Sequence, residues 1–451
     1  MELALLTPMT DSDHKRVIVG LGKTGVSVAR HFDSLALPFV MADTRENPSG
    51  LSSFIQEFPD TPVYSGALST QLFADARQVI VSPGVDLREP AIQYAISQGA
   101  ECLGDIELFA MANQIPVVAV TGSNGKSTVV QLVTDMACAS GIRAYAGGNV
   151  GRPALELLDL DDAELFVLEL SSFQLESTKS LKPHVSTVLN ISADHLDRHE
   201  TLERYAEIKA GIYTHATNSV VNRGDEYVSN METSGAISSF GLDDPVEGEF
   251  GLRPQGTRTY LAKGDEYLFP IDELAIPGES GVLNALAALA IGDVLSLPMG
   301  KMLLALASFK GLPHRLSRVG VLNGVEWFND SKGTNIGASI ASLRSLNGNV
   351  VLLAGGVFKG GDLDQFRSAV ARYAKHVILF GRDADLLRQA VSGAACVHSA
   401  NSMRDAVTIA KKLSVAGDKV LLSPACSSLD MYQDYSERGM DFESCFRELA
   451  T

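Results

Sequence analysis

The amino-acid sequence predicts an α/β protein built from three domains. Its 451 residues are too many for one hydrophobic core, since single cores stop growing at about 250–300 residues. Strand-like apolar runs alternate with helical stretches along the whole chain, which is typical of parallel sheets covered by helices on both faces. The runs carry few polar residues, as expected of strands buried on both sides. They include RVIVG, QVIVS, PVVAV, LFVLEL, STVLNI, NVVLLAG, HVILFG and KVLLS.

We expect the three domains to span residues 1–104, 105–311 and 312–451. The second boundary falls in the segment GLPHR, where glycine and proline interrupt the alternation of strands and helices. Residues 225–279 of the middle domain are rich in Gly, Ser, Asp and Glu, with short alternating pieces such as RTYLAK and EYLFP. This segment predicts a small, mostly antiparallel β layer beside the main sheet.

Composition and charge exclude several classes of protein. The net charge of −17 argues against a general nucleic-acid binder, which would carry a basic face. No run approaches the roughly 20 apolar residues that a membrane helix needs. Residues 1–16 have no basic segment ahead of an apolar one, so we expect no signal peptide. The five cysteines are scattered and never form Cys-x-x-Cys, which fits reduced thiols and predicts a cytoplasmic location.

The first glycine loop lies near the amino terminus. Residues 20–25, GLGKTG, follow a strand and precede a helix, which is the context of a G-x-G-x-x-G dinucleotide loop and predicts a Rossmann-like domain. Asp43 ends the next strand, where an acid that binds a ribose belongs. An NAD-dependent dehydrogenase, a turn that needs glycine only for packing, and a site for the diphosphate of a UDP-sugar are all compatible with this loop. We favour the UDP-sugar, because no hydride-transfer site accompanies the loop.

A phosphate-binding loop is the strongest signal in the chain. Residues 121–128, TGSNGKST, join the buried strand PVVAV to the helix TVVQLVTDMACAS. The strict P-loop pattern has glycine where this chain has Val120, but the chemistry is retained. Backbone N–H groups can wrap phosphates, Lys126 can reach the β and γ oxygens, and the Ser127 hydroxyl suits Mg²⁺. We therefore expect a P-loop ATPase-type middle domain that binds ATP through Gly122, Ser123, Asn124, Gly125, Lys126, Ser127 and Thr128.

The loop TGSNGKST resembles the ATP loop of the Mur ligases and of their folylpolyglutamate synthase relatives. Further motifs follow in the order of that family and cover nearly the whole chain: LELSSFQLE, NISADHLDRH, AEIKAGIY, GLPHR, NDSKGTN, LLAGGVFKGGD and LSPACSSLD. The set is most similar to the members that add D-glutamate, because the Asp-Asn-Pro-Arg segment typical of the members that add meso-diaminopimelate is absent.

This resemblance implies an ATP-dependent ligase of peptidoglycan precursor synthesis. Its substrates would be UDP-N-acetylmuramoyl-L-alanine, D-glutamate and ATP, bound mainly by the first, third and second domains in that order. Phosphorylation of the substrate carboxylate would turn a poor leaving group into phosphate, and the protein would position and neutralise the reacting anions. We expect a monomer that acts on these small molecules, with no nucleic acid and no membrane insertion.

The resemblance also implies a catalytic centre formed by Lys126, Glu169, His195 and Lys209. Glu169 and His195 would hold Mg²⁺ together with Ser127, with two ions in all, and Lys209 would be carbamylated, which turns a cation into an anionic metal ligand. From the local sequence alone, Glu169 would be a solvated carboxylate at the end of a strand, His195 would be a polar residue in a loop, and Lys209 would be a solvated lysine on a helix.

Other residues of the site follow from the same resemblance. Asn284, Arg315 and Asp330 would complete the ATP site, although Arg315 is also compatible with a salt bridge at a domain hinge. A dicarboxylate needs cations and hydroxyls, which the predicted D-glutamate pocket would supply through Lys332, Thr334, Lys359, Ser428 and Tyr435. The family has phenylalanine at the position of Tyr435. The UDP-substrate would contact Lys23, Thr24, Asp43, Thr44, Arg45, Ser82, Gly84 and Asn149.

Competing functions explain less of the sequence. A dehydrogenase accounts only for residues 20–25 and Asp43. A P-loop kinase or a non-catalytic NTPase switch accounts for residues 122–128 but not for His195, Lys209 or the later lysines. A ligase similar to folylpolyglutamate synthase shares the ATP site but does not need a domain that binds uridine.

Overall fold

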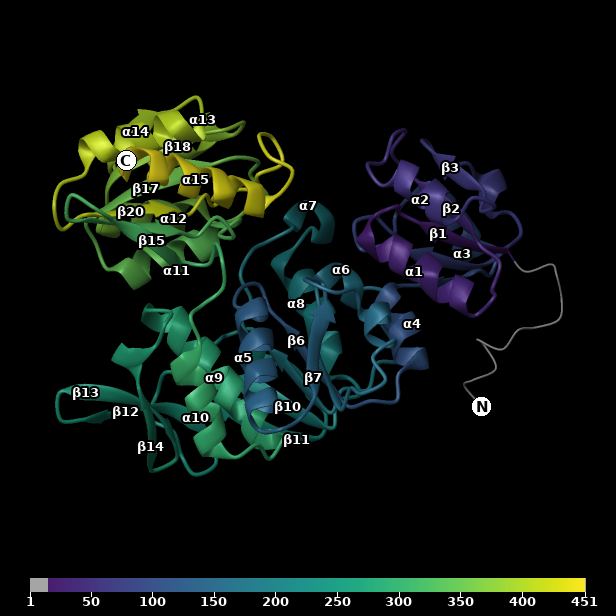
Figure 1. Ribbon diagram of the computed structural model, residues 1–451, viewed down its shortest axis with the longest axis horizontal. Coiled ribbons are helices and arrows are strands. Elements are labelled where there is room, and N and C mark those ends of the chain that lie inside the picture. Colours follow the sequence, from purple (N-terminus) through teal and green to yellow (C-terminus); the bar gives the residue numbers. More distant parts are fainter. Residues whose placement is uncertain (1–14, 451) are drawn as a thin grey trace.

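Three mostly parallel sheets follow one another along the chain, and each forms a separate unit covered by helices (Figure 1). The computed structural model describes residues 15–450. Residues 1–16, in which we expect no signal peptide, therefore lie almost entirely outside the described residues. The predicted α/β fold class with three units is confirmed, and each apolar run named above contains or overlaps a strand.

The amino-terminal unit is a five-stranded parallel sheet in the order β3-β2-β1-β4-β5. The strand order reverses between β1 and β4, so the loops that follow these two strands lie side by side at the switch point where such sheets bind ligands. Its elements are β1 (Lys15–Val19), α1 (Lys23–Ser34), β2 (Val40–Asp43), α2 (Leu51–Glu57), β3 (Val63–Ser65), β4 (Ala76–Val81), α3 (Pro90–Ser97) and β5 (Glu101–Leu103).

Helix α1 packs very closely on the first glycine loop. A Cβ atom at Gly25 would lie 1.9 Å from the carbonyl oxygen of Gly20, so no larger residue fits there without moving backbone. At Gly22 a Cβ atom would meet nothing within 4 Å. The third glycine of the loop is therefore required by packing, whatever the loop binds.

The central unit is a nine-stranded sheet in the order β14-β13-β12-β11-β10-β9-β6-β8-β7, parallel from β7 to β12. Its strands are β6 (Val117–Thr121), β7 (Ala144–Gly148), β8 (Leu165–Glu169), β9 (Val185–Val188), β10 (Asn218–Asn222), β11 (Ala236–Phe240), β12 (Phe250–Gln255), β13 (Arg258–Lys263) and β14 (Glu266–Pro270). Its helices are α4 (Asp105–Ala112), α5 (Lys126–Ala139), α6 (Ser172–Leu175), α7 (Leu196–His199), α8 (Leu202–Ala210), α9 (Gly278–Val294) and α10 (Met299–Ser308).

The predicted antiparallel segment is present as β12, β13 and β14. It does not form a separate sheet, because β12 pairs with β11 through Phe240 and Phe250 and so extends the parallel sheet. Figure 1 shows these strands at the side of the central unit away from β6 and β7.

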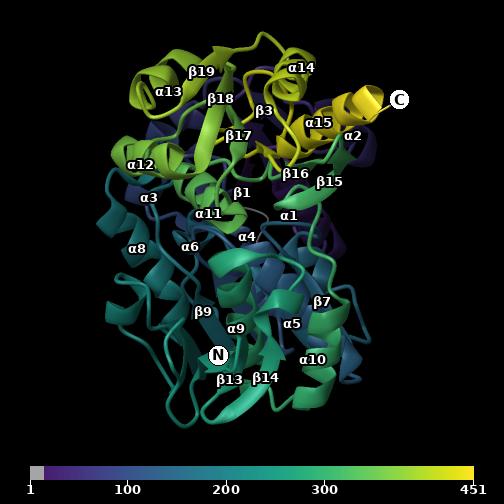
Figure 2. The same cartoon turned by 90° about the vertical axis from the view of Figure 1, so that its left-hand side faces the viewer.

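The carboxy-terminal unit is a six-stranded sheet in the order β15-β16-β20-β17-β18-β19, in which only the β15–β16 pair is antiparallel. Its elements are β15 (Ser317–Leu322), β16 (Val325–Asn329), α11 (Ile336–Leu346), β17 (Val350–Gly355), α12 (Leu363–Tyr373), β18 (Ala374–Phe380), α13 (Ala384–Ala390), β19 (Cys396–Ser399), α14 (Met403–Leu413), β20 (Lys419–Leu422) and α15 (Tyr435–Ala450). Figure 2 shows this unit stacked on the central unit.

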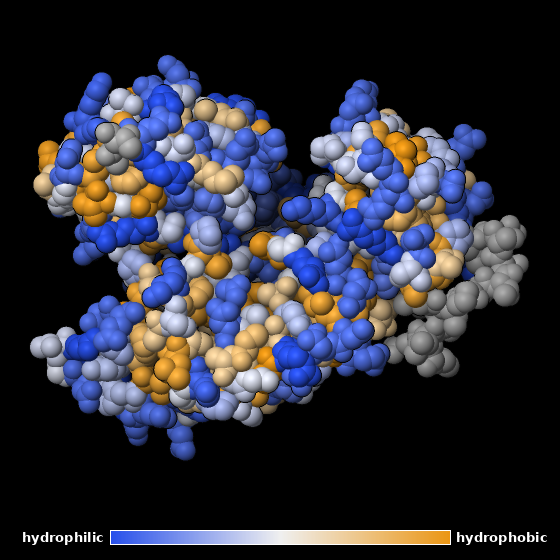
Figure 3. All heavy atoms as spheres, viewed as in Figure 1, coloured by the Kyte–Doolittle hydropathy of each residue, from blue (hydrophilic) through white to orange (hydrophobic). Residues whose placement is uncertain are grey.

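The hydrophobic cores join two of the three units. One cluster contains Ile18 and Phe32 of the amino-terminal sheet and helix together with Phe109 and Phe166 of the central unit. Within residues 15–450, no hydrophobic cluster of buried residues joins the carboxy-terminal unit to the others. Helices α9 and α11 of the two units pack against each other, and the contacts at the cleft between the units are polar. Figure 3 shows the surface hollowed between the two outer units.

Two expectations drawn from composition can be compared with the fold. Among the described residues no helix is long and apolar enough to cross a membrane. The five cysteines Cys102, Cys138, Cys396, Cys426 and Cys445 are all free thiols.

The packing at Gly25 predicts a specific loss of stability. Gly25→Ala should destabilise the amino-terminal unit by about 1–3 kcal/mol, because the new methyl group overlaps the Gly20 carbonyl. Gly22→Ala, in the same loop, is the control and should leave the melting temperature almost unchanged. Thermal unfolding followed by circular dichroism measures both, and equal melting temperatures for the two variants would contradict the packing argument.

Candidate functional site

The carboxyl ends of three adjacent strands meet at the centre of the large sheet. Strand β6 lies between β8 and β9, with Val120 paired to Glu169 and Thr121 paired to Val188. The phosphate-binding loop, Glu169 and the segment after β9 therefore come together at one edge, where parallel sheets place their ligands.

The phosphate-binding loop has the geometry that its glycines predict. Gly122 and Gly125 have φ angles of +146° and +86°, which other residues rarely adopt, and Asn284 of α9 lies directly against Gly125. The loop is held by the segment that follows β9, since the Ser123 N–H donates to the carbonyl of Asn190 at 2.9 Å. Lys126 folds back over the loop and donates from Nζ to the carbonyls of Gly122 and Ser123 at 2.8 and 3.0 Å. Its ammonium thus lies in the cradle that would receive phosphate oxygens.

Glu169, the last residue of β8, is buried beside the amino terminus of α5, among basic side chains and hydrogen-bond donors. Its carboxylate accepts hydrogen bonds from the hydroxyl of Ser127 and, at 2.7 Å, from Nδ2 of Asn149. Arg315, which precedes the carboxy-terminal sheet, donates to the same Ser127 hydroxyl at 2.7 Å. Burial opposes ionisation, but Lys126 and these neighbours hold the pKa of Glu169 below its usual value. Glu169 is therefore an ionised carboxylate.

The donor atoms around Glu169 fit a magnesium ion. Glu169 and Ser127 offer adjacent hard oxygens, the type that Mg²⁺ prefers, at a helix amino terminus where phosphate oxygens can complete the coordination. His195 lines the same cleft and could supply a nitrogen. Within the described residues, no group of three or more His, Cys, Asp and Glu side chains could hold a metal on its own. An ion here would therefore need further ligands, such as water or the oxygens of a bound nucleotide.

Lys209 is fully buried on α8 beneath the phosphate-binding loop. Its Nζ donates to the hydroxyl of Thr121 and the carbonyl of Gly122 at 3.1 and 3.0 Å and lies 4.7 Å from the centre of the Tyr205 ring. Among the described residues, no carboxylate oxygen lies within 4.0 Å of it. Burial and the neighbouring Lys126 lower the pKa of Lys209 far below its usual value. This lysine is therefore not the solvated helical residue that its sequence position alone suggests.

His195 and its neighbour Asp194 connect the central unit to the carboxy-terminal one. Asp194 is buried and accepts from Asn335 at 2.9 Å and from Lys359 at 3.1 Å. Burial opposes ionisation of Asp194, but Lys359 and His195 lower its pKa to about 2. Burial, partly offset by Asp194, lowers the pKa of His195 to about 4, so the imidazole is neutral near pH 7.

The carboxy-terminal unit contributes the other wall of the cleft. The ammonium of Lys332 lies 3.9 Å from the centre of the Tyr435 ring. Burial and the nearby Arg315 lower the pKa of Lys332 to about 7. The predicted residues that line this cleft of about 360 Å³ are Ser123, Asn124, Gly125, Lys126, Asn149, Glu169, His195, Lys209, Arg315, Lys332, Thr334, Lys359, Ser428 and Tyr435.

Some predicted residues lie elsewhere. Asp330 is enclosed, with both oxygens bonded within the fold, to Ser342 and Ser423 among others, and burial raises its pKa to about 6. Ser127 and Thr128 are buried at the start of α5, behind the surface of the cleft. The amino-terminal set, apart from Asn149, lies on the first unit, outside the cleft: Lys23, Thr24, Asp43, Thr44, Arg45, Ser82 and Gly84.

The amino-terminal set lies around the first glycine loop. Asp43 accepts from the N–H of Leu21 at 2.7 Å and from the guanidinium of Arg45 at 2.7 and 2.8 Å. The Ser82 hydroxyl donates to the carbonyl of Gly20 at 3.0 Å. Both carboxylate oxygens of Asp43 are thus already bonded, so Asp43 mainly orients the loop and the half-exposed Arg45 beside it.

Several residues of the cleft did not come from sequence reasoning. Asp194, Asn335, Phe173 and Tyr205 line it, and Tyr205 also touches the Ser123 hydroxyl at 3.3 Å. Each lies within or next to a motif that was recognised, but nothing in the local pattern shows that Asp194 would meet Lys359 from a different unit.

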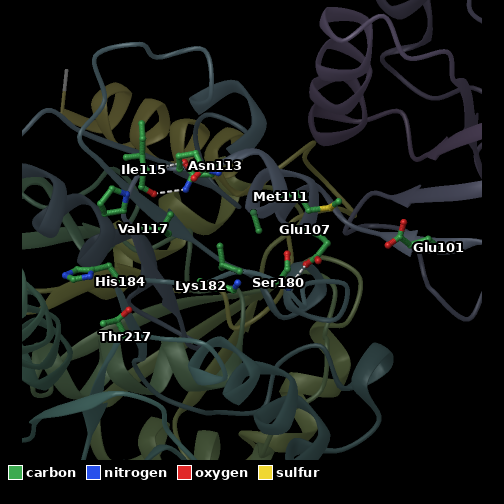
Figure 4. Close-up of a pocket in the computed structure, with 14 residues that line it drawn as sticks. Glu101, Glu107, Met111, Asn113, Ile115, Val117, Ser180, Lys182, His184 and Thr217 are labelled. Carbon is green, nitrogen blue, oxygen red and sulfur yellow. Dashed lines mark hydrogen bonds between the residues drawn. The ribbon is translucent and has the colours of Figure 1, made fainter. Parts of the chain in front are cut away.

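A larger cavity, of about 650 Å³, lies at the opposite edge of the central sheet, between α4 and the starts of β6 and β9 (Figure 4). Two of its polar side chains, Glu107 and Asn113, are used within the fold. Glu107 accepts from the N–H groups of Lys179 and Ser180 at 2.5 and 3.0 Å, and the Asn113 side chain closes a turn with Ile115. None of the predicted site residues lines this cavity, so we assign the candidate site to the smaller cleft.

Three family models match successive parts of the chain. They are "Mur ligase MurD-like, N-terminal domain" over residues 14–104, "Mur ligase middle domain" over 120–292 and "Mur ligase, glutamate ligase domain" over 314–426. The chain is 44% identical to a protein from Legionella pneumophila strain Paris named UDP-N-acetylmuramoylalanine--D-glutamate ligase, over 96% of this chain and 99% of that protein. It is 45% identical to a protein of the same name from Pseudomonas aeruginosa, over 97% of this chain and 99% of that one.

Solved structures with a similar fold are more distant in sequence. The UDP-N-acetylmuramate-alanine ligase of Thermotoga maritima aligns over 96% of this chain and 99% of its own, with a TM-score of 0.63 and 18% identity. A folylpolyglutamate synthase from Mycobacterium tuberculosis, complexed with ADP and AMPPCP, aligns over 75% of this chain and 93% of its own, with a TM-score of 0.58 and 17% identity. These likenesses support the fold alone.

The position of Lys126 predicts how the chain responds to nucleotide. Mg²⁺ and ATP should raise the melting temperature of the wild-type protein, and Lys126→Ala should lose most of that increase while remaining folded, because the loop then lacks its central cation. Lys310→Ala, at an exposed position, is the control and should respond as the wild type does. A full ATP response in Lys126→Ala would show that nucleotide binds elsewhere.

Proposed function

The chain belongs to the Mur ligase family, and from this premise we propose that it joins D-glutamate to UDP-N-acetylmuramoyl-L-alanine with cleavage of ATP to ADP and phosphate. The observation that carries this proposal is the cleft itself, where a phosphate-binding loop, an ionised carboxylate and lysines from a second unit face one another. The near-complete alignment with relatives named as D-glutamate ligases supports the choice of amino acid.

The reaction needs two transfers, and the residues divide between them. In the first, the substrate carboxylate attacks the γ-phosphorus of ATP, a new O–P bond forms and ADP leaves with the electrons of the broken O–P bond. Lys126 and Arg315 stand where they would neutralise charge on the transferred phosphoryl group. Magnesium held by Glu169 and Ser127, with a second ion near His195, would supply further charge neutralisation when bound.

In the second transfer, the amine of D-glutamate attacks the acyl carbon, the C–N bond forms, the acyl C–O bond breaks, and inorganic phosphate leaves with the electrons of that bond while the amine loses one proton. Lys332, Lys359, Thr334 and Ser428 would hold the two carboxylates of the amino acid, and the Tyr435 ring would keep Lys332 in place. Burial lowers the pKa of Lys332 to about 7, and a carboxylate bound beside it would favour its charged form, which suits Lys332 to this role.

The amino-terminal unit would bind the UDP portion of the substrate. Its first glycine loop and the loop after β4 adjoin at the switch point, and Arg45, braced by Asp43, stands beside them. Asn149 would contact the substrate inside the cleft rather than at the uridine end, because it lies on Glu169. We assign residues 1–104, 105–311 and 312–451 to the UDP-substrate, ATP and amino-acid domains, and propose that the enzyme works as a monomer in the cytoplasm.

We further propose that Lys209 carries a carbamate in the active enzyme. Its neutral amine would add to CO₂, forming an N–C bond and releasing one proton, and burial lowers its pKa in the direction that this requires. The product would be a carboxylate beneath the phosphate-binding loop, close to where Glu169 and His195 would hold Mg²⁺. Substrate oxygens, Glu169, His195 and this carbamate would together offer the hard ligands that the chain alone lacks.

The choice of amino acid gives the first test of the function. With ATP and UDP-N-acetylmuramoyl-L-alanine present, phosphate release should require D-glutamate, because the predicted pocket has lysines for two carboxylates and the similar proteins are named as D-glutamate ligases. L-Glutamate, meso-diaminopimelate and L-alanine should give rates at least 10-fold lower. Release that is equal for all amino acids, or that needs a folate substrate instead, would refute the proposed function.

The carbamate gives a second, independent test. Lys209→Ala should lose activity by about 10²–10³-fold, since it removes a charged group aimed at the metal site, and acetate should restore part of it. Lys301→Ala, an exposed helical lysine, serves as the control. Carbon-13 NMR of the wild-type protein with labelled bicarbonate should show a carbamate signal that Lys209→Ala lacks. An active Lys209→Ala protein that ignores acetate would contradict the modification.

A further inference from the structure

Helix α7 holds Arg198 between the amino-terminal and central units. The helix is only four residues long and stands at the top of the central unit, facing the gap between the two outer units (Figure 1). Positive φ angles flank it, +55° at His195 and +68° at Glu200. Such backbone conformations are costly for residues other than glycine, so contacts around α7 must hold it in place.

The Arg198 guanidinium contacts both units at once. Nη1 donates to the carbonyl of Val85 at 3.1 Å, and Nε lies 3.6 Å from the carboxylate of Asp86, both in the amino-terminal unit. Nη2 donates to Glu176 of the central unit at 2.6 Å. The Arg198 side chain is only 11% exposed, so these contacts are largely shielded from water.

The same guanidinium is connected to His195 through one aromatic ring. It lies over the Phe173 ring, 5.4 Å from its centre. Phe173 lines the cleft and meets the His195 ring edge-to-face at 4.8 Å, while His199 stacks on it at 5.3 Å. Removing the guanidinium would leave the Phe173 ring free to shift, and His195 would lose a fixed neighbour.

On its other side, Arg198 fixes the loop that follows β4. Val85 and Asp86 come directly after Ser82 and Gly84, and the Ser82 hydroxyl is bonded to the first glycine loop through the Gly20 carbonyl. A chain of contacts therefore runs from the loops at the switch point, through Arg198 and Phe173, to the cleft.

We infer that Arg198 is a positioning residue that sets the distance between the loop after β4 and His195, so that a substrate held at its diphosphate end presents its carboxylate correctly in the cleft. The inference rests on the proposed function, because it requires one substrate to span the two units. It assigns to Arg198 no contact with the reacting atoms.

A neighbouring ion pair provides a matched control. Arg88 of the amino-terminal unit donates to Glu200 of the central unit at 2.8 Å, so it also bridges the two units, and it donates to Asp86 at 2.8 Å. Its side chain is 54% exposed and that of Glu200 is 73% exposed, and exposed pairs of this kind contribute little. If any ion pair between the two units had the same effect, replacing Arg88 and replacing Arg198 by alanine would change the kinetic constants equally.

The test compares Arg198→Ala, Arg198→Lys and Arg88→Ala by steady-state kinetics. Arg198→Ala should lower kcat/KM for UDP-N-acetylmuramoyl-L-alanine at least 10-fold and leave the KM for ATP within 2-fold of wild type. Guanidinium ion at millimolar concentration should restore part of the loss, and lysine should not replace arginine fully because it lacks the planar fork. Arg88→Ala should stay within 2-fold in every constant. The inference would be overturned if Arg198→Ala and Arg88→Ala had the same kinetic constants. It would also be overturned if Arg198→Ala raised the KM for ATP as much as the KM for UDP-N-acetylmuramoyl-L-alanine.

Hydrogen exchange separates this inference from the proposed function. UDP-N-acetylmuramoyl-L-alanine alone, without ligation, should slow exchange of the backbone N–H groups of residues 195–200 in the wild type and in Arg88→Ala but not in Arg198→Ala. Similar protection in all three proteins would overturn the role of Arg198. A wild-type protein that shows the protection but adds no D-glutamate would instead refute the proposed function and leave the positioning role supported.

Discussion

The structure depends on the burial of basic side chains at the converging strand ends. Five basic side chains line the cleft, Lys126, Lys209, Arg315, Lys332 and Lys359, against three carboxylates, Glu169, Asp194 and Asp434. This happens in a protein whose net charge is −17. Burial lowers the pKa values of Lys126, Lys209 and Lys332, and nearby basic side chains lower them further, among them Arg315 for Lys126 and Lys332, and Lys126 for Lys209. Such a cleft is suited to ligands that bring several negative charges, as ATP and a dicarboxylic amino acid do.

The same constraint explains how the carboxy-terminal unit is attached. No hydrophobic cluster of the described residues joins it to the central unit, and the contacts at the cleft are polar: Arg315 to Ser127, Lys359 to Asp194 and Asn335 to Asp194. Polar interfaces between units separate more readily than apolar ones. The residues that would bind phosphate and amino acid are thus also the ones that hold the units together, so ligand binding and closure draw on the same charges. The amino-terminal unit differs, because it shares a hydrophobic cluster with the central unit, and polar contacts such as that of Arg198 with Val85 add to this packing.

Sequence patterns predicted the local features well, because strands, glycine loops and the P-loop are encoded by neighbouring residues. The strands β1, β6 and β8 and the conformations of Gly122 and Gly125 follow from short segments. The family resemblance then brought distant motifs to one cleft. What could not be predicted arises from tertiary contacts: Asp330 is enclosed by Ser342 and Ser423, and the carboxylate of Asp43 is already bonded to Leu21 and Arg45. Burial of Lys209, which decides its chemistry, also depends on the packing of α8 under β6 rather than on the helix sequence.

The central claim is that the cleft activates a carboxylate by transferring a phosphoryl group to it. The most direct measurement uses UDP-N-acetylmuramoyl-L-alanine with ¹⁸O in the terminal carboxylate, turned over with ATP and D-glutamate, and mass spectrometry of the released phosphate. Attack of the carboxylate on the γ-phosphorus followed by loss of phosphate from the acyl carbon carries one labelled oxygen into the phosphate. We predict one ¹⁸O atom in the phosphate for each amide formed. Amide formation with unlabelled phosphate would contradict the acyl-phosphate route and, with it, the roles assigned here to Lys126 and Arg315.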